Sequence, residues 1–255
     1  MNQVKAKKHL GQHFLTDESI ARRIASSLRR TDCRVLEIGP GMGVLTKYLL
    51  SDGLPDFHAV EIDRESVDYL HDEFPQLDFI EGDFLKLDLL PHPDSRLAII
   101  GNFPYNISSQ ILFRVFDHRA NVDEVVGMFQ KEVAERVAAA PGSKTYGILS
   151  VLLGAFYDIE YLFTVSETVF NPPPKVKSAV IRLTRNSVEQ LPCDEKMFVR
   201  TVKAGFNLRR KTLRNALRAA ALPIDTVPDE TLAKRAEQLS VEQFITLTQT
   251  IEQCQ

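Results

Sequence analysis

The sequence predicts an α/β fold with a largely parallel sheet, followed by a smaller all-helical domain. Short apolar runs typical of strands alternate with amphipathic runs typical of helices over the first 185 residues. This alternation is typical of parallel strands with helices on both faces of the sheet. The composition turns polar at residues 184–194, and the strand pattern then disappears. We therefore expect a first domain over residues 1–185, with a basic N-terminal tail, and a helical domain over residues 186–255.

The expected elements follow from the spacing of the apolar side chains. Strands are expected at residues 34–38, 57–62, 77–80, 97–100, 122–129, 158–165 and 176–183. Helices are expected at residues 44–51, 64–73, 107–117, 131–139, 196–205, 210–221, 229–237 and 241–253. The last two strands suit an antiparallel edge of the sheet. A further helix is expected to begin after Thr16, which would be its N-cap, with two acids in the first turn.

Composition and cysteine spacing exclude several classes of protein. The chain has 255 residues, of which 44% are hydrophobic and 25% charged, as in ordinary globular proteins. Cys33, Cys193 and Cys254 stand far apart, which disfavours a zinc site and a disulfide framework and suits a reducing cytoplasm. Residues 1–10 lack the apolar core of a secretory signal. Polar residues interrupt the most apolar stretch, 146–163, so we expect no membrane span.

Positive charge is concentrated in two segments of a chain whose net charge is −3. Residues 1–30 carry seven Lys or Arg against two acids, and residues 200–218 carry seven and no acid. Clusters of this kind attract nucleic-acid phosphates. A charge run alone is as often a solvated helix face. We expect Arg209, Arg210 and Lys211 to contact the phosphates of a bound nucleic acid.

A glycine-rich turn follows the first expected strand. Residues 37–43 read Glu-Ile-Gly-Pro-Gly-Met-Gly, and missing side chains at Gly39 and Gly41 let a ligand approach the backbone. The third glycine comes one position earlier than in the dinucleotide-binding pattern G-x-G-x-x-G. A ligand without a pyrophosphate is therefore favoured.

Two acids follow the next two expected strands. Glu61 is placed to accept hydrogen bonds from both hydroxyls of a ribose, the role of an acid about 20 residues beyond a nucleotide-binding turn. Asp83 is placed to accept one from an adenine amine. The glycine turn and both acids fall at successive strand ends, the edge where open α/β sheets bind ligands. The alternative is that both acids only cap helices or loops. Their ordered spacing favours a nucleoside-containing cofactor.

The most specific element is the turn after the fourth strand, Gly-Asn-Phe-Pro-Tyr-Asn at residues 101–106. An exocyclic aryl amine is a poor nucleophile because its lone pair is delocalised into the ring. The side-chain carbonyl of Asn102 and the backbone carbonyl of Pro104 can each accept one amine hydrogen and direct the lone pair at a methyl group on a sulfonium. This chemistry needs no metal. A tight turn would explain the Asn and Pro, but not their place beside the cofactor elements.

Two aromatic residues are candidates for holding the target base. Tyr105 follows the acceptors directly and would stack on a base that is unpaired or extruded. Phe170 precedes Asn-Pro-Pro-Pro and could sandwich the base against Tyr105. Packing of Phe170 in the core is equally favoured by the sequence.

Five segments closely resemble the ribosomal RNA adenine dimethyltransferases, and the likeness spans nearly the whole chain. These segments are residues 8–15, 37–41, 102–106, 169–176 and 206–213. The resemblance implies a Rossmann-like S-adenosylmethionine-dependent methyltransferase domain and a small all-helical RNA-binding domain. It also implies that His13 and Leu15 line the methionine end of the cofactor with Gly39. Asn102 then lies where the methyl group meets its target, with Glu61 on the ribose and Asp83 on the adenine of the cofactor.

Within the family, the chain looks most like the branch that acts on the small ribosomal subunit. That resemblance implies dimethylation of two adjacent adenines in the hairpin loop near the 3′ end of 16S rRNA, in the small subunit or its precursor, by a monomer. Two residues depart from the usual pattern: Phe103 stands where Leu is usual, and Leu208 where Gln is frequent. The first change should leave the two acceptors in place.

Three other functions remain open from the sequence. A large-subunit adenine methyltransferase of the macrolide-resistance type shares every catalytic element, but the 206–213 segment and the proline-rich loop favour the small-subunit branch. An RNA-binding ribosome-assembly factor with incidental methylation is a second alternative. A DNA-adenine methyltransferase is less favoured, because a small helical domain offers little for sequence readout.

Overall fold

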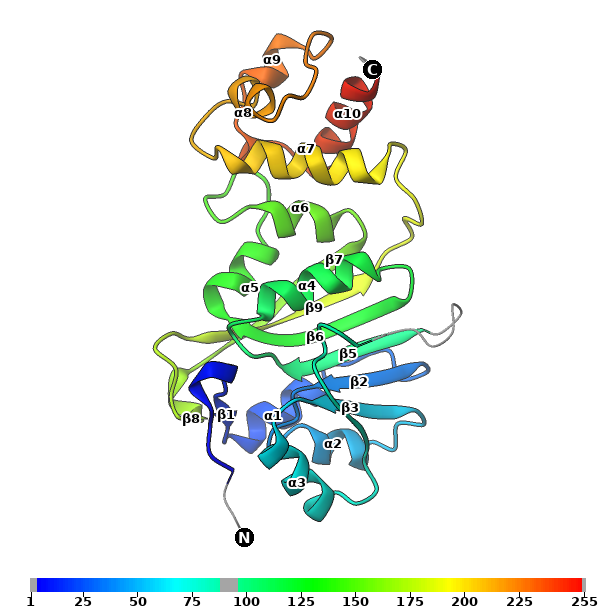
Figure 1. Ribbon diagram of the computed structural model, residues 1–255, viewed down its shortest axis with the longest axis vertical. Helices are drawn as coiled ribbons and strands as arrows, with labels where there is room; N and C mark the ends of the chain where they lie inside the picture. The colour runs from blue at the N-terminus through cyan, green and yellow to red at the C-terminus, as the bar shows by residue number, and fades with distance from the viewer. Residues whose placement is uncertain (1–3, 88–95, 254–255) are drawn as a thin grey trace. The chain divides into compact units, whose positions relative to one another are not determined.

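The computed structural model describes residues 4–87 and 96–253 and divides into two compact units (Figure 1). The first unit comprises residues 1–134 and 159–185, and the second comprises residues 135–158 and 186–255. The sequence places one boundary after residue 185, and the structure adds residues 135–158 to the helical unit. The reason is that this stretch contains a buried helix that packs with the later helices. Cys254 lies outside the described residues.

A seven-stranded sheet forms the first unit, in the order β4-β3-β2-β5-β6-β9-β7. Its strands are β2 (Arg34–Ile38), β3 (Phe57–Glu61), β4 (Asp78–Glu81), β5 (Leu97–Asn102), β6 (Val122–Gln130), β7 (Tyr157–Val165) and β9 (Ser178–Arg185). Strands β2 to β6 pair in parallel, and β9 pairs antiparallel with β6. The expected parallel sheet and the antiparallel pairing of its late strand β9 are confirmed.

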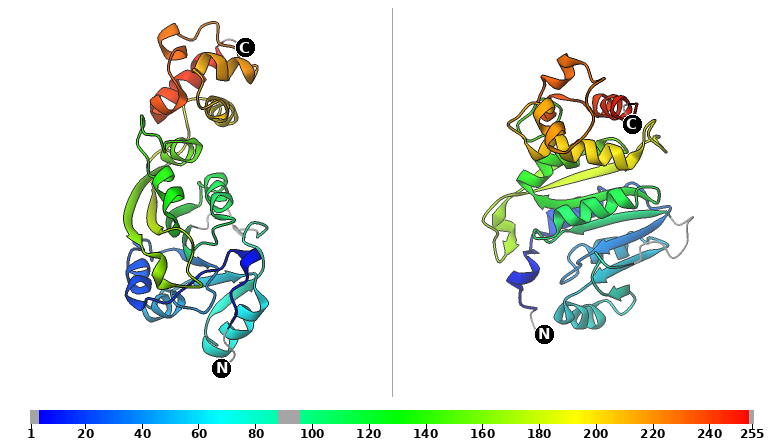
Figure 2. Two further views of the ribbon diagram at one scale, coloured as in Figure 1. Left: turned by 90° about the vertical axis from the view of Figure 1, so that its left-hand side faces the viewer. Right: turned by 45° about the horizontal axis from the view of Figure 1, so that its top comes forward.

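Helices lie on both faces of this sheet (Figure 2). They are α1 (Glu18–Ala25), α2 (Thr46–Ser51), α3 (Arg64–Glu73), α4 (Ser108–Asp117) and α5 (Lys131–Val137), the last of which runs into the second unit. The cap expected at Thr16 is wrong by one residue. Asp17 caps α1 by accepting from the backbone N–H groups of Ser19 and Ile20, whereas Thr16 donates to the carbonyl of Val169.

A two-stranded antiparallel sheet joins the N-terminal segment to a late loop. Strand β1 (Phe14–Leu15) pairs with β8 (Phe170–Asn171). Each strand follows a 3-10 helix, η1 (Lys8–Leu10) before β1 and η2 (Glu167–Val169) before β8. In Figure 1 the segment before α1 lies beside β8. Val4 is 7% exposed, so the N-terminal segment is packed against the domain.

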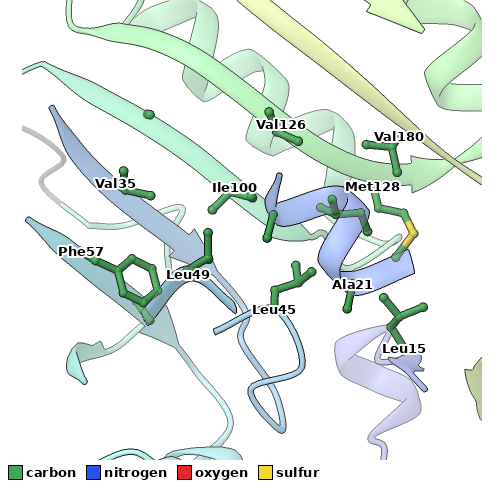
Figure 3. Packing of buried hydrophobic residues seen from close by; sticks show 14 of the residues in the cluster. Leu15, Ala21, Val35, Leu45, Leu49, Phe57, Ile100, Val126, Met128 and Val180 are labelled. Carbon is green, nitrogen blue, oxygen red and sulfur yellow. The ribbon is translucent and has the colours of Figure 1, made fainter. Parts of the chain in front are cut away.

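The core of the first unit lies between the sheet and the helices α1 and α2 (Figure 3). Val35, Ile100 and Val126 contribute from three neighbouring strands, while Ala21 and Leu49 contribute from the two helices. These strand residues belong to near-continuous apolar runs, as expected for parallel strands that are covered on both faces.

The second unit is helical, as expected. It contains α6 (Ile148–Gly154), α7 (Glu195–Asn207), α8 (Leu213–Ala219), α9 (Asp229–Leu232), η3 (Ala236–Gln238) and α10 (Val241–Glu252). The long helix α7 packs with α6, α8 and α10. The expected helix at 229–237 is two short pieces, and the one expected at 210–221 begins only at Leu213. Among the described residues, none of the helices has the length and apolarity that a membrane span requires.

Phe103 fits into the first unit because two glycines face it. Its side chain is 1% exposed, and its ring lies edge-on to Phe129 with the ring centroids 5.0 Å apart. A Cβ atom at Gly127 would overlap both rings, and one at Gly101 would lie 2.6 Å from the carbonyl oxygen of Ile38. The larger side chain at position 103 is therefore accommodated within the core.

We expect Gly127→Ala to destabilise the protein by about 1–3 kcal/mol, because the added methyl group overpacks the core. The melting temperature should fall by about 2–4 °C per kcal/mol. Phe103→Leu should recover part of this loss in the Gly127→Ala background, as a double-mutant cycle would measure. Gly82→Ala is the control, because a Cβ there meets nothing within 4 Å. Equal melting temperatures for Gly127→Ala and Gly82→Ala would contradict this account.

Candidate active site

A pocket of about 180 Å³ opens at the carboxyl ends of strands β2, β3, β4 and β5. The turns that follow these strands form most of its wall, and residues 10–14 of the N-terminal segment form the rest. The structure brings eight of the expected site residues together here: His13, Gly39, Gly41, Glu61, Asp83, Asn102, Pro104 and Tyr105. They come from five separate parts of the chain and meet because parallel strands end at one edge of the sheet.

A second cavity, of about 400 Å³, adjoins the first. Phe14, Gly39, Gly41 and Asn102 border both cavities, and Leu15 borders only the second. Gly41 has φ +58°, and a Cβ atom there would lie 2.9 Å from the ring of Phe14. Both the backbone conformation and the close approach therefore require glycine. The glycine turn therefore forms part of the wall of both cavities.

Glu61 is the most buried acid of the first pocket, with 4% of its surface exposed. One of its carboxylate oxygens accepts from the backbone N–H groups of Ile62 and Asp63 at 2.8 Å, and the other accepts from Gly41 at 3.1 Å. Burial raises the pKa of Glu61, while these backbone donors act in the opposite direction. The carboxylate is fixed in orientation and ties the glycine turn to the end of β3.

The N-terminal segment is held over the pocket by an ion pair that the sequence did not indicate. The ammonium of Lys7 contacts the carboxylate of Asp63, and Gln12 donates to the same carboxylate at 3.1 Å. Burial acts to raise the pKa of Asp63, but the hydrogen bonds from Lys7 and Gln12 outweigh it and lower that pKa. Because Lys7 and Asp63 are 56 residues apart, no local pattern could have revealed the contact.

Asn102 is anchored through its amide nitrogen, which donates to the backbone carbonyl of His13 at 2.9 Å. A carboxamide held by its nitrogen has its oxygen free as an acceptor. The carbonyl of Pro104 accepts from Ile107 at 3.2 Å and keeps a second lone pair. Both acceptors belong to residues of the first pocket.

Tyr105 and His13 form an aromatic pair at the pocket, with ring centroids 5.2 Å apart. The hydroxyl of Tyr105 lies 2.5 Å from that of Ser178, and Nδ1 of His13 donates to the carbonyl of Pro172 at 2.7 Å. Burial raises the pKa of Tyr105, although the hydrogen bond to Ser178 acts against this. The ring of Tyr105 is thus held in place beside the two acceptors.

Phe170 is placed differently from the expectation. Phe170 is 4% exposed, belongs to the core cluster and does not line the first pocket. Leu15 is 3% exposed and faces Phe170 across the β1–β8 pair. The pairing turns both side chains into the core, so the structure corrects the expected sandwich of a base between Phe170 and Tyr105. Leu15 borders the second cavity only.

Most cations of the first basic segment have partners within the protein. Arg29 pairs with Glu160, Arg30 with Asp32 and Asp123, and Lys7 with Asp63. The guanidinium groups of Arg22 and Arg23 lie over the rings of Tyr48 and Phe163. The count of charges in the sequence therefore overestimates the positive charge that this segment offers to phosphates.

In the second unit, Arg209, Arg210 and Lys211 are all exposed. The guanidinium of Arg209 donates to the carbonyls of Lys144 and Tyr146, the latter at 3.0 Å. Leu208 is 38% exposed. Of the three cations expected to contact phosphates, only Arg209 is hydrogen-bonded to these carbonyls; Arg210 and Lys211 are not.

The α/β fold, with its pocket at the carboxyl edge of the sheet, is that of an S-adenosylmethionine-dependent methyltransferase. A family model described as ribosomal RNA adenine dimethylase matches residues 3–253, and the chain belongs to this family. A curated relative from Cytophaga hutchinsonii is 62% identical over 97% of this chain and 98% of its own length. One from Flavobacterium johnsoniae is 59% identical over 99% and 98%. Both are named ribosomal RNA small subunit methyltransferase A.

Two solved structures are similar over almost the whole chain. A dimethyladenosine transferase from Plasmodium falciparum aligns with a TM-score of 0.78 at 26% identity, covering 94% of this chain and 98% of its own. The 23S rRNA methyltransferase ErmE aligns with a TM-score of 0.74 at 24% identity, covering 94% and 99%. The likeness to ErmE shows a shared fold.

Lys7→Ala should weaken the binding of S-adenosylmethionine about fivefold, or about 1 kcal/mol. The change leaves the buried carboxylate of Asp63 without its cation and loosens the segment that closes the pocket. Isothermal titration calorimetry would measure the affinity. Arg34→Ala is the matched control. It removes the ion pair between Arg34, at the start of β2, and Asp56, and neither residue lines the pocket. Equal affinities for the wild type and Lys7→Ala would refute a role of Lys7 in the pocket.

Glu37 gives the stability of the protein a defined pH dependence. It is 1% exposed and accepts from the hydroxyl of Thr46 at 2.7 Å. Burial raises its pKa to about 8 from 4.5, and the charge of Glu61 adds to this. The folded state therefore holds a proton that the unfolded chain releases above pH 4.5, so stability falls as the pH rises towards 8.

Glu37→Gln should remove this dependence, because the amide cannot ionise and its oxygen still accepts from Thr46. The variant should match the wild type near pH 5 and exceed it at pH 8. The difference should grow by at most about 1.4 kcal/mol per pH unit. Urea unfolding at pH 5, 6, 7 and 8 measures it. Parallel stability curves for the two proteins would show that Glu37 does not titrate in this range.

Proposed function

We propose that this protein transfers methyl groups from S-adenosylmethionine to the exocyclic amines of two adjacent adenines. The substrate is the hairpin loop near the 3′ end of 16S rRNA, in the small ribosomal subunit or its precursor, during assembly in the cytoplasm. Membership of the adenine dimethylase family and the high identity to relatives named for the small subunit support this assignment. We expect the active protein to be a monomer.

The observation that carries the proposal is the anchoring of Asn102. Its amide nitrogen is held by the carbonyl of His13, so Oδ1 remains to accept one hydrogen of the adenine amine. The carbonyl of Pro104 would accept the other hydrogen. Two acceptors at one amine favour a pyramidal nitrogen and stabilise the positive charge that develops on it as the new C–N bond forms. The two acceptors also fix the direction of the nitrogen lone pair.

Tyr105 is proposed to hold the target base. An adenine must leave its stack to enter the pocket, and an aromatic ring beside the acceptors offers a replacement stacking surface. The hydroxyl of Tyr105 is held by Ser178 and its ring lies against His13. The ring is therefore fixed before the base arrives, which reduces the loss of entropy on binding.

The residues of the two cavities fit S-adenosylmethionine. Glu61 is a buried acceptor suited to the ribose hydroxyls, Asp83 suits the adenine amine, and the exposed apolar side chain of Ile62 offers a surface for the adenine ring. Gly39 and Gly41, with His13 and Leu15 nearby, would hold the methionine end. When bound, the cofactor supplies the methyl group as an electrophile on a cationic sulfur.

The helical unit is proposed to bind RNA through Arg210 and Lys211. Both side chains are exposed on the segment between α7 and α8, and contacts of Lys or Arg with phosphates supply most sequence-independent affinity for RNA. Arg209 would contribute by holding the 144–146 turn in place as well as by its charge.

The direct test is methylation of undermethylated small subunits with labelled S-adenosylmethionine, followed by mapping of the modified nucleosides. We expect dimethyladenosine at two adjacent positions of 16S rRNA. Asn102→Ala should lower kcat about 100-fold or more, as expected when one aligned group that stabilises a developing charge is lost. Its melting temperature should stay close to that of the wild type, and kcat is measured at saturating S-adenosylmethionine because Asn102 borders both cavities.

Large ribosomal subunits are assayed in parallel, and binding of the protein to small subunits is measured separately. Label in 23S rRNA and none in 16S rRNA would assign the protein to the large subunit. Tight binding to small subunits without any label would identify an assembly factor. Full activity of Asn102→Ala would exclude the proposed role of that side chain.

A further inference from the structure

The loop of residues 172–177, Pro-Pro-Pro-Lys-Val-Lys, connects β8 to β9 in the first unit. Only Pro172 of this loop takes part in the site described above, through its contact with His13. Lys175, Val176 and Lys177 are exposed, with 47% of the surface of Val176 accessible, whereas Pro174 is buried. A large apolar side chain between two cations is thus presented to solvent.

Both ends of the 172–177 loop are attached to the wall of the first pocket. At its start, the carbonyl of Pro172 accepts from Nδ1 of His13 at 2.7 Å. At its end, Ser178 lies 2.5 Å from the hydroxyl of Tyr105. His13 and Tyr105 both line the pocket. The loop is therefore fastened at both ends to residues of the pocket wall, and it directly follows β8 of the β1–β8 pair (Figure 1).

The charge of the 172–177 loop is not compensated locally. No acid occurs between Glu167 and Glu189 in the sequence. Within the part of the chain that the structure describes, neither Lys175 nor Lys177 forms an ion pair. In contrast, Lys7 is paired with an acid and Lys47 with another. Two free ammonium groups beside the pocket are suited to phosphates.

We propose that the 172–177 loop is a second RNA-binding surface, which holds the nucleotides that flank the target adenine. Lys175 and Lys177 contact phosphates on either side of the extruded nucleotide, and Val176 packs against a neighbouring base or ribose. This inference rests on the proposed function and adds to it the residues that hold the single strand at the pocket. The surface belongs to the first unit and is separate from Arg210 and Lys211.

The contact also has a mechanistic consequence. Extrusion of a base costs a few kcal/mol, and contacts with the flanking backbone help to offset that cost. Because the loop is fastened to His13 and Tyr105, RNA bound on it is placed relative to the ring that receives the base. Loss of the lysines should therefore raise KM for RNA more than it lowers kcat.

The test compares Lys175→Ala, Lys177→Ala and the double variant with Lys196→Ala, which removes an exposed lysine beside Asp194 and Glu195 at the start of α7. The substrate is the undermethylated small subunit. The double variant should raise KM five- to tenfold, with kcat changed less than threefold. The slope of log affinity against log salt should become shallower by about 1 per lost phosphate contact. Lys→Arg at both positions should restore KM, and Lys196→Ala should match the wild type.

Three results would overturn the proposal: an unchanged KM and salt slope in the double variant, an equal effect of Lys196→Ala, or a comparable loss of affinity for S-adenosylmethionine. The last result would indicate that the loop only supports the pocket. Failure of the proposed function is recognised separately, because the wild-type protein itself would then leave the adenines of small subunits unmethylated.

Discussion

The pocket at the carboxyl edge of the sheet depends on the hydrogen bonds of one buried carboxylate, that of Glu61. It accepts three backbone hydrogen bonds, from Gly41 on the turn after β2 and from Ile62 and Asp63 at the end of β3. An acid so deeply buried is stable only when its acceptors are satisfied. These bonds fix the glycine turn, and the same carboxylate lines the pocket. The next residues extend the arrangement, because Asp63 fastens the N-terminal segment through Lys7 and Gln12.

The reacting side of the pocket depends on contacts between distant segments. Asn102 is oriented by the backbone of His13, and His13 is in turn held by Pro172. Tyr105 is held by Ser178 on the other side of the same loop. The N-terminal segment, the turn after β5 and the 172–177 loop therefore support one another at the pocket. Asn102 and Tyr105 are thus each held by a partner outside the turn, and side chains held in this way keep the alignment that a functional site requires.

Phe103 shows how the core accommodates a large side chain in the turn after β5. Gly101 and Gly127 leave the space that the ring fills, and Phe129 packs against its edge. The ring is buried in the core, while Asn102 and Pro104 of the same turn line the pocket.

The sequence by itself determined the order of strands and helices, the helical second unit and the residues at each strand end, because apolar periodicity and turn chemistry are local properties. Since parallel strands end at one edge, it also determined that Gly41, Glu61, Asp83 and Asn102 would meet. Only the tertiary structure decided the partners of Lys7 and Arg29, the burial of Phe170 and the assignment of residues 135–158 to the helical unit. Each of these depends on contacts between residues far apart in the chain, whose pairing is set by packing rather than by any pattern in the sequence.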